Sequence, residues 1–156
     1  MEDFRVPKRA VLVNVTRPDG ATSQVEVYLS EYAPNHAGGE RVSEMLNSGM
    51  FLPVRDPGRN KISFLNSSSV VIARVDREVE ADDDAAAHTI PTEYEVEVTL
   101  TTGKPVQGLL TFVLPPDRAR VLDYLKGCPK FIPLIEADRL ALINRDYIAA
   151  IEVLTQ

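Results

Sequence analysis

The sequence has no tryptophan, one cysteine and two histidines among its 156 residues. A single cysteine, Cys128, cannot form a disulfide within the chain, so a reducing compartment is expected. No apolar run approaches the roughly 20 residues that cross a bilayer, which excludes a transmembrane helix. The N-terminus begins with acids and lacks the apolar core of a signal peptide. We therefore predict a cytoplasmic protein that does not associate with membranes.

Groups that commonly build active sites are equally scarce. His36 and His88 lie in loop-like stretches, without a second ligand at metal-binding spacing. Cys128 has lysines nearby, but neither histidine is close to it in sequence. No glycine-rich phosphate-binding motif occurs. We predict no catalytic residue, no metal site and no cofactor, and hence a protein that is not an enzyme.

The net charge of −6 comes from one short stretch. Residues 76–93, DREVEADDDAAAHTIPTE, hold seven acids and one base, while the segments on either side are nearly neutral. Neither segment has the basic balance typical of proteins that bind phosphate backbones. This composition is typical of a flexible acidic linker.

What the sequence does contain is an internal repeat. The phrase MFLPVRDPGRNKISFLN reappears about eighty positions later as KFIPLIEADRLALIN, and ISFLNSSSVVIARV aligns without a gap to LALINRDYIAAIEV. Upstream, VNVTRPDGATSQVEVYL matches VEVTLTTGKPVQGLLTF, with Gly20 on Gly103. We interpret the repeat as an internal duplication.

Each copy predicts a hairpin, a short helix and three short strands. Alternating valines around Pro18-Asp19-Gly20 favour the first hairpin. The later strands are predicted at 50–54, 61–66 and 69–75, and at 130–135, 139–144 and 147–154. The helices have the apolar faces Val42, Met45 and Leu46, and Val121, Tyr124 and Leu125, with stops at Gly49 and Gly127 and an N-cap at Asp117 in the second.

The predicted fold is α+β, mainly β, with two tandem ββαβββ modules related by duplication. The modules cover 1–75 and 94–156, and 76–93 is the acidic linker. A five-stranded sheet of this size cannot bury both faces while open, so each module is expected to curl into a small barrel.

Pro53 and Pro133 lack a backbone N–H and are therefore expected on an edge strand or at a bulge. Each module alone is marginal in size. We predict that the two pack on each other through helix-side or edge-strand surfaces, while 79–90 crosses as a loop with little order.

VEVTLTTGKPVQGLL followed by LALINRDYIAAIEVL resembles the two motifs of the Sm-like fold, a small β-barrel of SH3-like form. The repeated phrase also looks like a small bacterial domain of uncharacterised function. The Sm-like resemblance implies binding of single-stranded RNA or other nucleic acid through Asn144 and Arg145, with Asn66 as their first-copy counterpart. A helix after the second strand, and Asn144-Arg145 in place of the usual pair, depart from that pattern.

Arg55 and Arg59, followed by Asn66-Ser67-Ser68, resemble the PilZ pattern that binds cyclic dinucleotides through paired arginines. Val71 stands where that pattern ends in glycine, and a hairpin loop with solvated charges is the alternative. The helix arginines Arg41 and Arg120 keep their place in both copies, either as surface pairs with Glu44 and Asp123 or as docking residues.

Duplicated structural positions without a duplicated reactive group favour a protein-interaction or self-assembly module that acts through two similar faces. Its candidate partner-binding residues are Arg41, Arg120, Arg55 and Arg59. Single-stranded nucleic-acid binding is the first alternative, and cyclic-dinucleotide sensing is the second.

Overall fold

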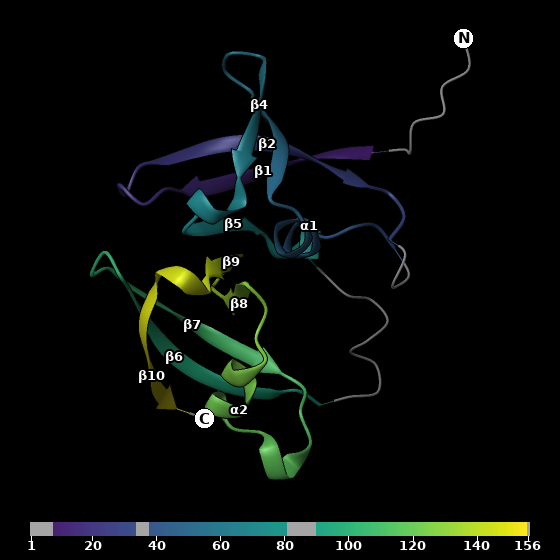
Figure 1. The fold of residues 1–156 in the computed structure, drawn as a ribbon. Helices are drawn as coiled ribbons and strands as arrows, with labels where there is room; N and C mark the ends of the chain where they lie inside the picture. The colour runs from purple at the N-terminus through teal and green to yellow at the C-terminus, as the bar shows by residue number, and fades with distance from the viewer. Residues whose placement is uncertain (1–7, 34–37, 81–89, 156) are drawn as a thin grey trace.

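A computed structural model describes residues 8–33, 38–80 and 90–155. Within these residues the chain is mainly β, with one ten-stranded antiparallel sheet and two short α-helices. The strand order is β10-β6-β7-β8-β9-β5-β1-β2-β3-β4. Figure 1 shows the N-terminal half above the C-terminal half, with β5 and β9 meeting between them.

The elements follow the predicted sequence of hairpin, helix and three strands in each half. The N-terminal half contains β1 (Lys8–Thr16), β2 (Thr22–Ser30), α1 (Val42–Ser48), β3 (Phe51–Asp56), β4 (Lys61–Asn66) and β5 (Ile72–Asp76). The C-terminal half contains β6 (Thr92–Leu100), β7 (Pro105–Phe112), α2 (Val121–Lys126), β8 (Phe131–Ile135), β9 (Arg139–Asn144) and β10 (Ile148–Thr155).

The two halves share their strand order and most of their registers, and β10 differs from β5 in having register shifts against β6. The order β5-β1-β2-β3-β4 in the first half is repeated as β10-β6-β7-β8-β9 in the second. Phe51 pairs with Asn66 in the first half, and Phe131 pairs with Asn144 at the corresponding place in the second. Corresponding residues of the two halves therefore occupy corresponding places in the sheet.

Short 3₁₀ turns precede the last strand of each half, which begins later than predicted, β5 at Ile72 and β10 at Ile148. The turns are Ser67–Ser69 and Arg145–Tyr147. In each, the asparagine side chain just before the turn accepts a hydrogen bond from the backbone N–H two residues on. Because each asparagine caps a tight turn in this way, β4 ends at Asn66 and β9 ends at Asn144.

Both helices occur where the sequence predicts them, and Gly49 and Gly127 follow their last residues. The predicted N-cap of the second helix is wrong. Asp117 lies in a separate 3₁₀ turn, Pro116–Arg118, and Arg120 is the residue that precedes α2. A proline at the start of that turn fixes the backbone for a tight turn of its own, so the helix begins only after it.

The proline strands are not edge strands. β3 lies between β2 and β4, and β8 lies between β7 and β9. However, β2 pairs with β3 only at Val54 and Arg55, and β7 pairs with β8 only at Ile135. Pro53 and Pro133 therefore lie beyond the end of the pairing on that side, where a missing N–H is tolerated.

Two apolar clusters form the core, and each takes residues from both halves. The cluster built on β1, β2 and α1 includes Phe131 and Leu142 from the C-terminal half. The cluster built on β6, β7 and β8 includes Val71 and Ile72 from the N-terminal half. The two expected small modules are thus joined in one continuous sheet and complete each other's cores.

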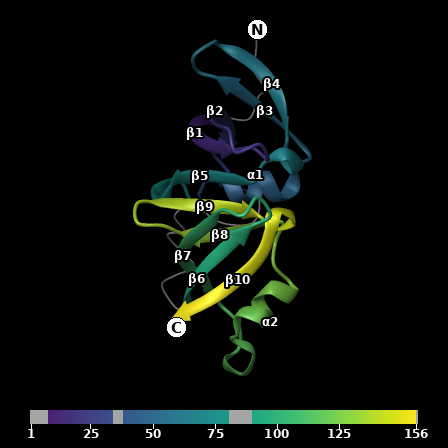
Figure 2. The same ribbon diagram turned by 90° about the vertical axis from the view of Figure 1, so that its left-hand side faces the viewer.

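The sheet ends in two strands, β4 and β10, that each have one paired neighbour. Figures 1 and 2 show these strands far apart in both views, with β4 at the top and β10 toward the bottom. In the part of the chain that the structure describes, neither helix is long and apolar enough to cross a membrane.

The predicted acidic linker, 76–93, is described only at its two ends. β5 extends to Asp76, a 3₁₀ turn follows at Arg77–Glu80, and β6 begins at Thr92. Residues 81–89, which make up most of the predicted loop 79–90, lie outside the described residues.

Candidate interaction surface

The β3–β4 hairpin turns an apolar face to solvent. Phe51 is 58% exposed, Phe64 is 70% exposed, and Ile62 is exposed beside them. The register places Phe51 opposite Asn66, Phe64 opposite Pro53 and Ile62 opposite Arg55, so the three apolar side chains share one side of the hairpin with Arg55 at its end. We call Phe51, Ile62 and Phe64 the hairpin face. A grouped apolar face of this kind is typical of an interaction site.

The hairpin is held against β2 by Arg55. Its Nη2 lies 2.7 Å from Glu26 Oε1, its Nε donates to the same oxygen at 2.8 Å, and its Nη1 donates to Asn60 Oδ1 at 2.7 Å. Arg59 is exposed, and its Nε lies 3.2 Å from Asp56 Oδ2. The guanidinium of Arg55 is thus committed to the hairpin itself, and Arg59 is the more accessible of the two predicted arginines.

The corresponding hairpin of the C-terminal half, β8–β9, buries the same face. Phe131 and Leu142, the counterparts of Phe51 and Phe64, are each 0% exposed. Both pack into the cluster of the N-terminal half, together with Val70 and Ala73. In this protein the apolar face of one hairpin is therefore buried against the other half, and the apolar face of its counterpart is uncovered.

The β5–β9 pairing and the packing of Phe131 and Leu142 form what we call the inter-half contact. Polar groups close its margins. Phe131 N donates to Asn47 Oδ1 at 2.8 Å, and Lys130 Nζ donates to Ser68 Oγ at 2.9 Å. Arg74 Nε and Glu136 Oε1 form a half-buried ion pair at 3.0 Å.

The asparagines predicted for nucleic-acid binding have different environments. Asn144 is 0% exposed; its Nδ2 donates to Val70 O at 3.0 Å and its Oδ1 accepts from Asp146 N at 3.0 Å. Asn66 is half-buried, and its Oδ1 accepts from Ser68 N at 2.9 Å. Arg145 Nη1 donates to Cys128 O at 2.7 Å. Most of these polar groups are already used inside the protein.

Arg41 and Arg120 each stand immediately before a helix, one in each half. The backbone N–H of Arg41 donates to Glu44 Oε1 at 2.9 Å, which satisfies one donor at the start of α1. Arg120 is exposed. The two arginines keep equivalent places, as the repeat predicts, but on different helices.

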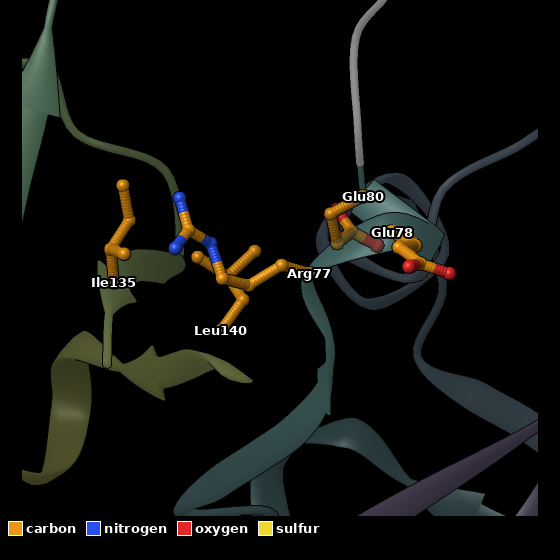
Figure 3. A pocket seen from close by; sticks show the side chains of 5 residues that line it. All are labelled: Arg77, Glu78, Glu80, Ile135 and Leu140. Carbon is orange, nitrogen blue, oxygen red and sulfur yellow. The ribbon is translucent and has the colours of Figure 1, made fainter. Parts of the chain in front are cut away.

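A pocket of about 360 Å³ lies between the turn after β5 and the β8–β9 hairpin. Figure 3 shows the residues that line it, Arg77, Glu78, Glu80, Ile135 and Leu140. The Arg77 side chain extends toward Leu140 and Ile135. Glu80 is held at the start of α1 instead, where its carboxylate accepts from Ser43 Oγ at 2.6 Å and from Ser43 N at 3.2 Å. Burial raises the pKa of the Glu80 carboxyl above its ordinary value, although these hydrogen bonds oppose the shift. The carboxylate serves to fasten the turn to α1.

A second pocket, of about 480 Å³, lies beside α2 and β10. Its lining is mostly apolar and includes Leu125, Cys128, Ile132, Ile148 and Ile151, together with the charged Arg145 and Asp146. The corresponding place in the N-terminal half, beside α1, is filled by the inter-half contact. We call the unfilled one the α2 pocket.

Among residues 8–33, 38–80 and 90–155, no group of three or more His, Cys, Asp or Glu side chains could hold a metal ion. His36 and His88 lie outside these ranges. Cys128 is buried and free of any disulfide.

The hairpin face was missed by sequence reasoning. Phe51 and Phe131 stand in the same phrase, so the sequence does not show which of them is buried. The signal that could have found it is the repeat itself, since a contact made by only one copy leaves the other copy's face open. Comparison with protein-family models, curated proteins and solved structures gave no match.

Proposed function

We propose that this chain is a non-enzymatic, cytoplasmic interaction and assembly protein, built by duplication of a ββαβββ unit, that binds a protein partner through the hairpin face. The observation that carries the proposal is the exposure of Phe51 and Phe64 at positions whose counterparts, Phe131 and Leu142, are fully buried in a contact between two folded units.

That contrast favours protein binding over other uses of the surface. Grouped exposed aromatic and aliphatic side chains are enriched at the centre of protein interfaces, where they bury well against an apolar partner. Phe51, Ile62 and Phe64 carry no charge, and the guanidinium of Arg55, which lies opposite Ile62, is bound to Glu26 and Asn60, so the hairpin face offers little to a phosphate backbone. The chain already covers one such face with protein.

Duplication is supported by the matching order and registers of the two halves. A duplicated unit keeps two similar faces, and covering one of them within the chain leaves the other for a partner. The nucleic-acid alternative gains no support, because the amide of Asn144 is buried and bonded within the protein.

The test is affinity capture from native lysate with the intact chain and with Phe64→Lys, which places a charge in the hairpin face. Leu12→Lys is the matched control, because Leu12 is also an exposed strand residue but lies on β1. We expect the unmodified chain and Leu12→Lys to retain the same protein, which is either another protein of the lysate or an added tagged copy of this chain. Phe64→Lys is expected not to retain it.

Equal retention by all three forms, with both variants folded by circular dichroism, would overturn the proposal. Retention of RNA in place of protein, lost on Arg145→Ala but not on Phe64→Lys, would favour the nucleic-acid alternative instead.

A further inference from the structure

We propose that the partner of the hairpin face is a second copy of this chain, whose β10 pairs with β4 in the register of the β5–β9 contact. This inference rests on the proposed function and names its partner. It adds that the assembly is head to tail, with a different edge used on each copy.

The inter-half contact provides the template. β5 and β10 are the last strands of the two halves, and β4 and β9 are the strands before them. The chain makes the contact between β5 and β9 but not the corresponding contact between β10 and β4, which form the two ends of the sheet. An exposed strand edge is a template for pairing with another chain.

The template fixes a register. In the β5–β9 contact Ile72 pairs with Ile143, and Arg74 pairs with Ala141. Residues 62–75 align with 140–153 without a gap, so these pairs transfer to corresponding residues of β10 and β4. The transfer places Ala150 opposite Leu65 and Glu152 opposite Ser63 of the second copy.

The same register brings apolar side chains together. Ile151 comes to lie opposite Phe64, and Val153, which is 47% exposed, opposite Ile62. Their counterparts in the existing contact include Ala73, Val75 and Leu142, which are all buried. Positions that are buried in one contact thus stay apolar at the free edges, where Phe64, Ile62 and Val153 are exposed.

The α2 pocket supplies a site for Phe51. In the N-terminal half, Phe131 packs in the cluster that contains Leu46, Leu52 and Val70, beside α1. The counterparts of those three residues, Leu125, Ile132 and Ile148, line the α2 pocket. Because Phe51 is the counterpart of Phe131, a second copy placed by the template would bring Phe51 to this pocket.

Charge favours two different edges over two like ones. β4 carries one charged residue, Lys61, and β10 carries one, Glu152. The transferred register sets these two diagonally on the same side of the sheet, within reach of long side chains. Pairing of β4 with β4, or of β10 with β10, would instead bring like charges to the same contact.

The two free edges lie too far apart to meet within one chain (Figures 1 and 2). A contact that joins two different surfaces is repeated from copy to copy until it closes into a ring or continues as a filament. The expected assembly is therefore larger than a dimer at high concentration.

The first experiment measures mass by light scattering at concentrations around 100 µM, where a contact of micromolar affinity is populated. We expect oligomers for the intact chain and for Leu12→Lys, and monomers for Phe64→Lys and for Val153→Lys alone. A mixture of the two edge variants should form heterodimers, because each retains the edge that the other has lost.

The second experiment tests the register. Chains with Ser63→Cys and chains with Glu152→Cys are mixed and oxidised, and we expect a disulfide-linked dimer on a non-reducing gel. The matched control mixes Ser63→Cys with Leu12→Cys, whose cysteines lie at exposed positions that the register does not bring together. Residual self-linking of either single variant gives the background.

A monomeric intact chain at every concentration, with no linked dimer, would overturn the inference. So would loss of assembly in Phe64→Lys together with normal assembly in Val153→Lys, because that pattern indicates a symmetric β4 contact. If the chain is monomeric but Phe64→Lys still abolishes capture of another protein, this inference fails and the proposed function stands. If capture is also unchanged, both fail.

Discussion

The side-chain amide of Asn144, at the end of β9, donates a hydrogen bond to the carbonyl oxygen of Val70, just before β5, at 3.0 Å. The backbone N–H of Asn144 also donates to Val71 O at 2.9 Å. A fully buried amide therefore ties the last turn of one half to the other half, while its Oδ1 caps its own turn.

Asn144→Ala is expected to lower the free energy of unfolding by about 2–4 kcal/mol, because it removes a cap and leaves the buried Val70 carbonyl without this donor. Asn66→Ala is the matched control: among the described residues the counterpart amide makes the cap to Ser68 and no bond to the other half, so a loss of about 1 kcal/mol is expected. Urea denaturation of both variants measures the difference. Equal losses would show that the bond to Val70 contributes nothing.

Gly108→Ala is expected to destabilise the β7–β8 contact. A β-carbon at position 108 would lie 2.7 Å from Ile135 O and 2.7 Å from Leu134 Cγ, so the strands would have to separate. Overpacking of this kind costs about 1–3 kcal/mol. Gly127→Ala, where a β-carbon meets nothing within 4 Å, should change stability by less. Thermal unfolding compares the two, and a harmless Gly108→Ala would contradict the close approach.

Burial raises the pKa of Tyr124 to about 12, and the nearby Cys128 adds to the shift. The folded state disfavours the phenolate, so the buried neutral phenol contributes to the free energy of unfolding. This contribution is complete below the ordinary pKa of 10.0 and is lost as the pH rises toward about 12. Tyr124→Phe keeps the ring that stacks on Phe112 but cannot ionise. We expect the stability of the unmodified chain to fall relative to Tyr124→Phe across this alkaline range, as measured by denaturant midpoints. Parallel curves would contradict the shift.

Ser43→Ala removes the hydroxyl that donates to Glu80 at 2.6 Å. The pKa of Glu80 is already raised, so ionisation of this carboxyl costs stability as the pH rises from its ordinary value of 4.5 through the folded value. Without the hydroxyl, ionisation of Glu80 costs more stability. The free energy of unfolding of the variant should therefore fall by about 1–3 kcal/mol at neutral pH and by less in acid. Ser48→Ala, on the same helix but away from Glu80, is the control, and a loss independent of pH would argue against the carboxylate.

Separate fragments covering 1–80 and 90–156 should be unstable or associate with each other, since each core cluster contains residues of the other half. Mixing them should restore the circular dichroism of the intact chain. Two independent, cooperative, monomeric unfolding transitions would show instead that each half is complete without its partner.

The mainly-β fold and the strand positions could be predicted because alternation, turn glycines and the repeat all act locally. The N-cap at Asp117 was predicted wrongly because Pro115-Pro116 starts a separate turn, which local patterns do not distinguish from a helix start. The hairpin face could not be found from the sequence, since Phe51 and Phe131 differ only in what the other half places on them. That difference arises from the β5–β9 pairing, which joins residues far apart in the chain.

The position of Phe131 and Leu142 in the N-terminal core also sets the order in which the protein can mature during synthesis. A ribosome releases β1 to β5 long before β8 and β9 exist, so the first half must wait with part of its apolar cluster open. Pairings between distant segments close slowly, which lengthens this interval. We therefore expect the chain to be most open to chaperone binding and to aggregation while only its first half has been synthesised.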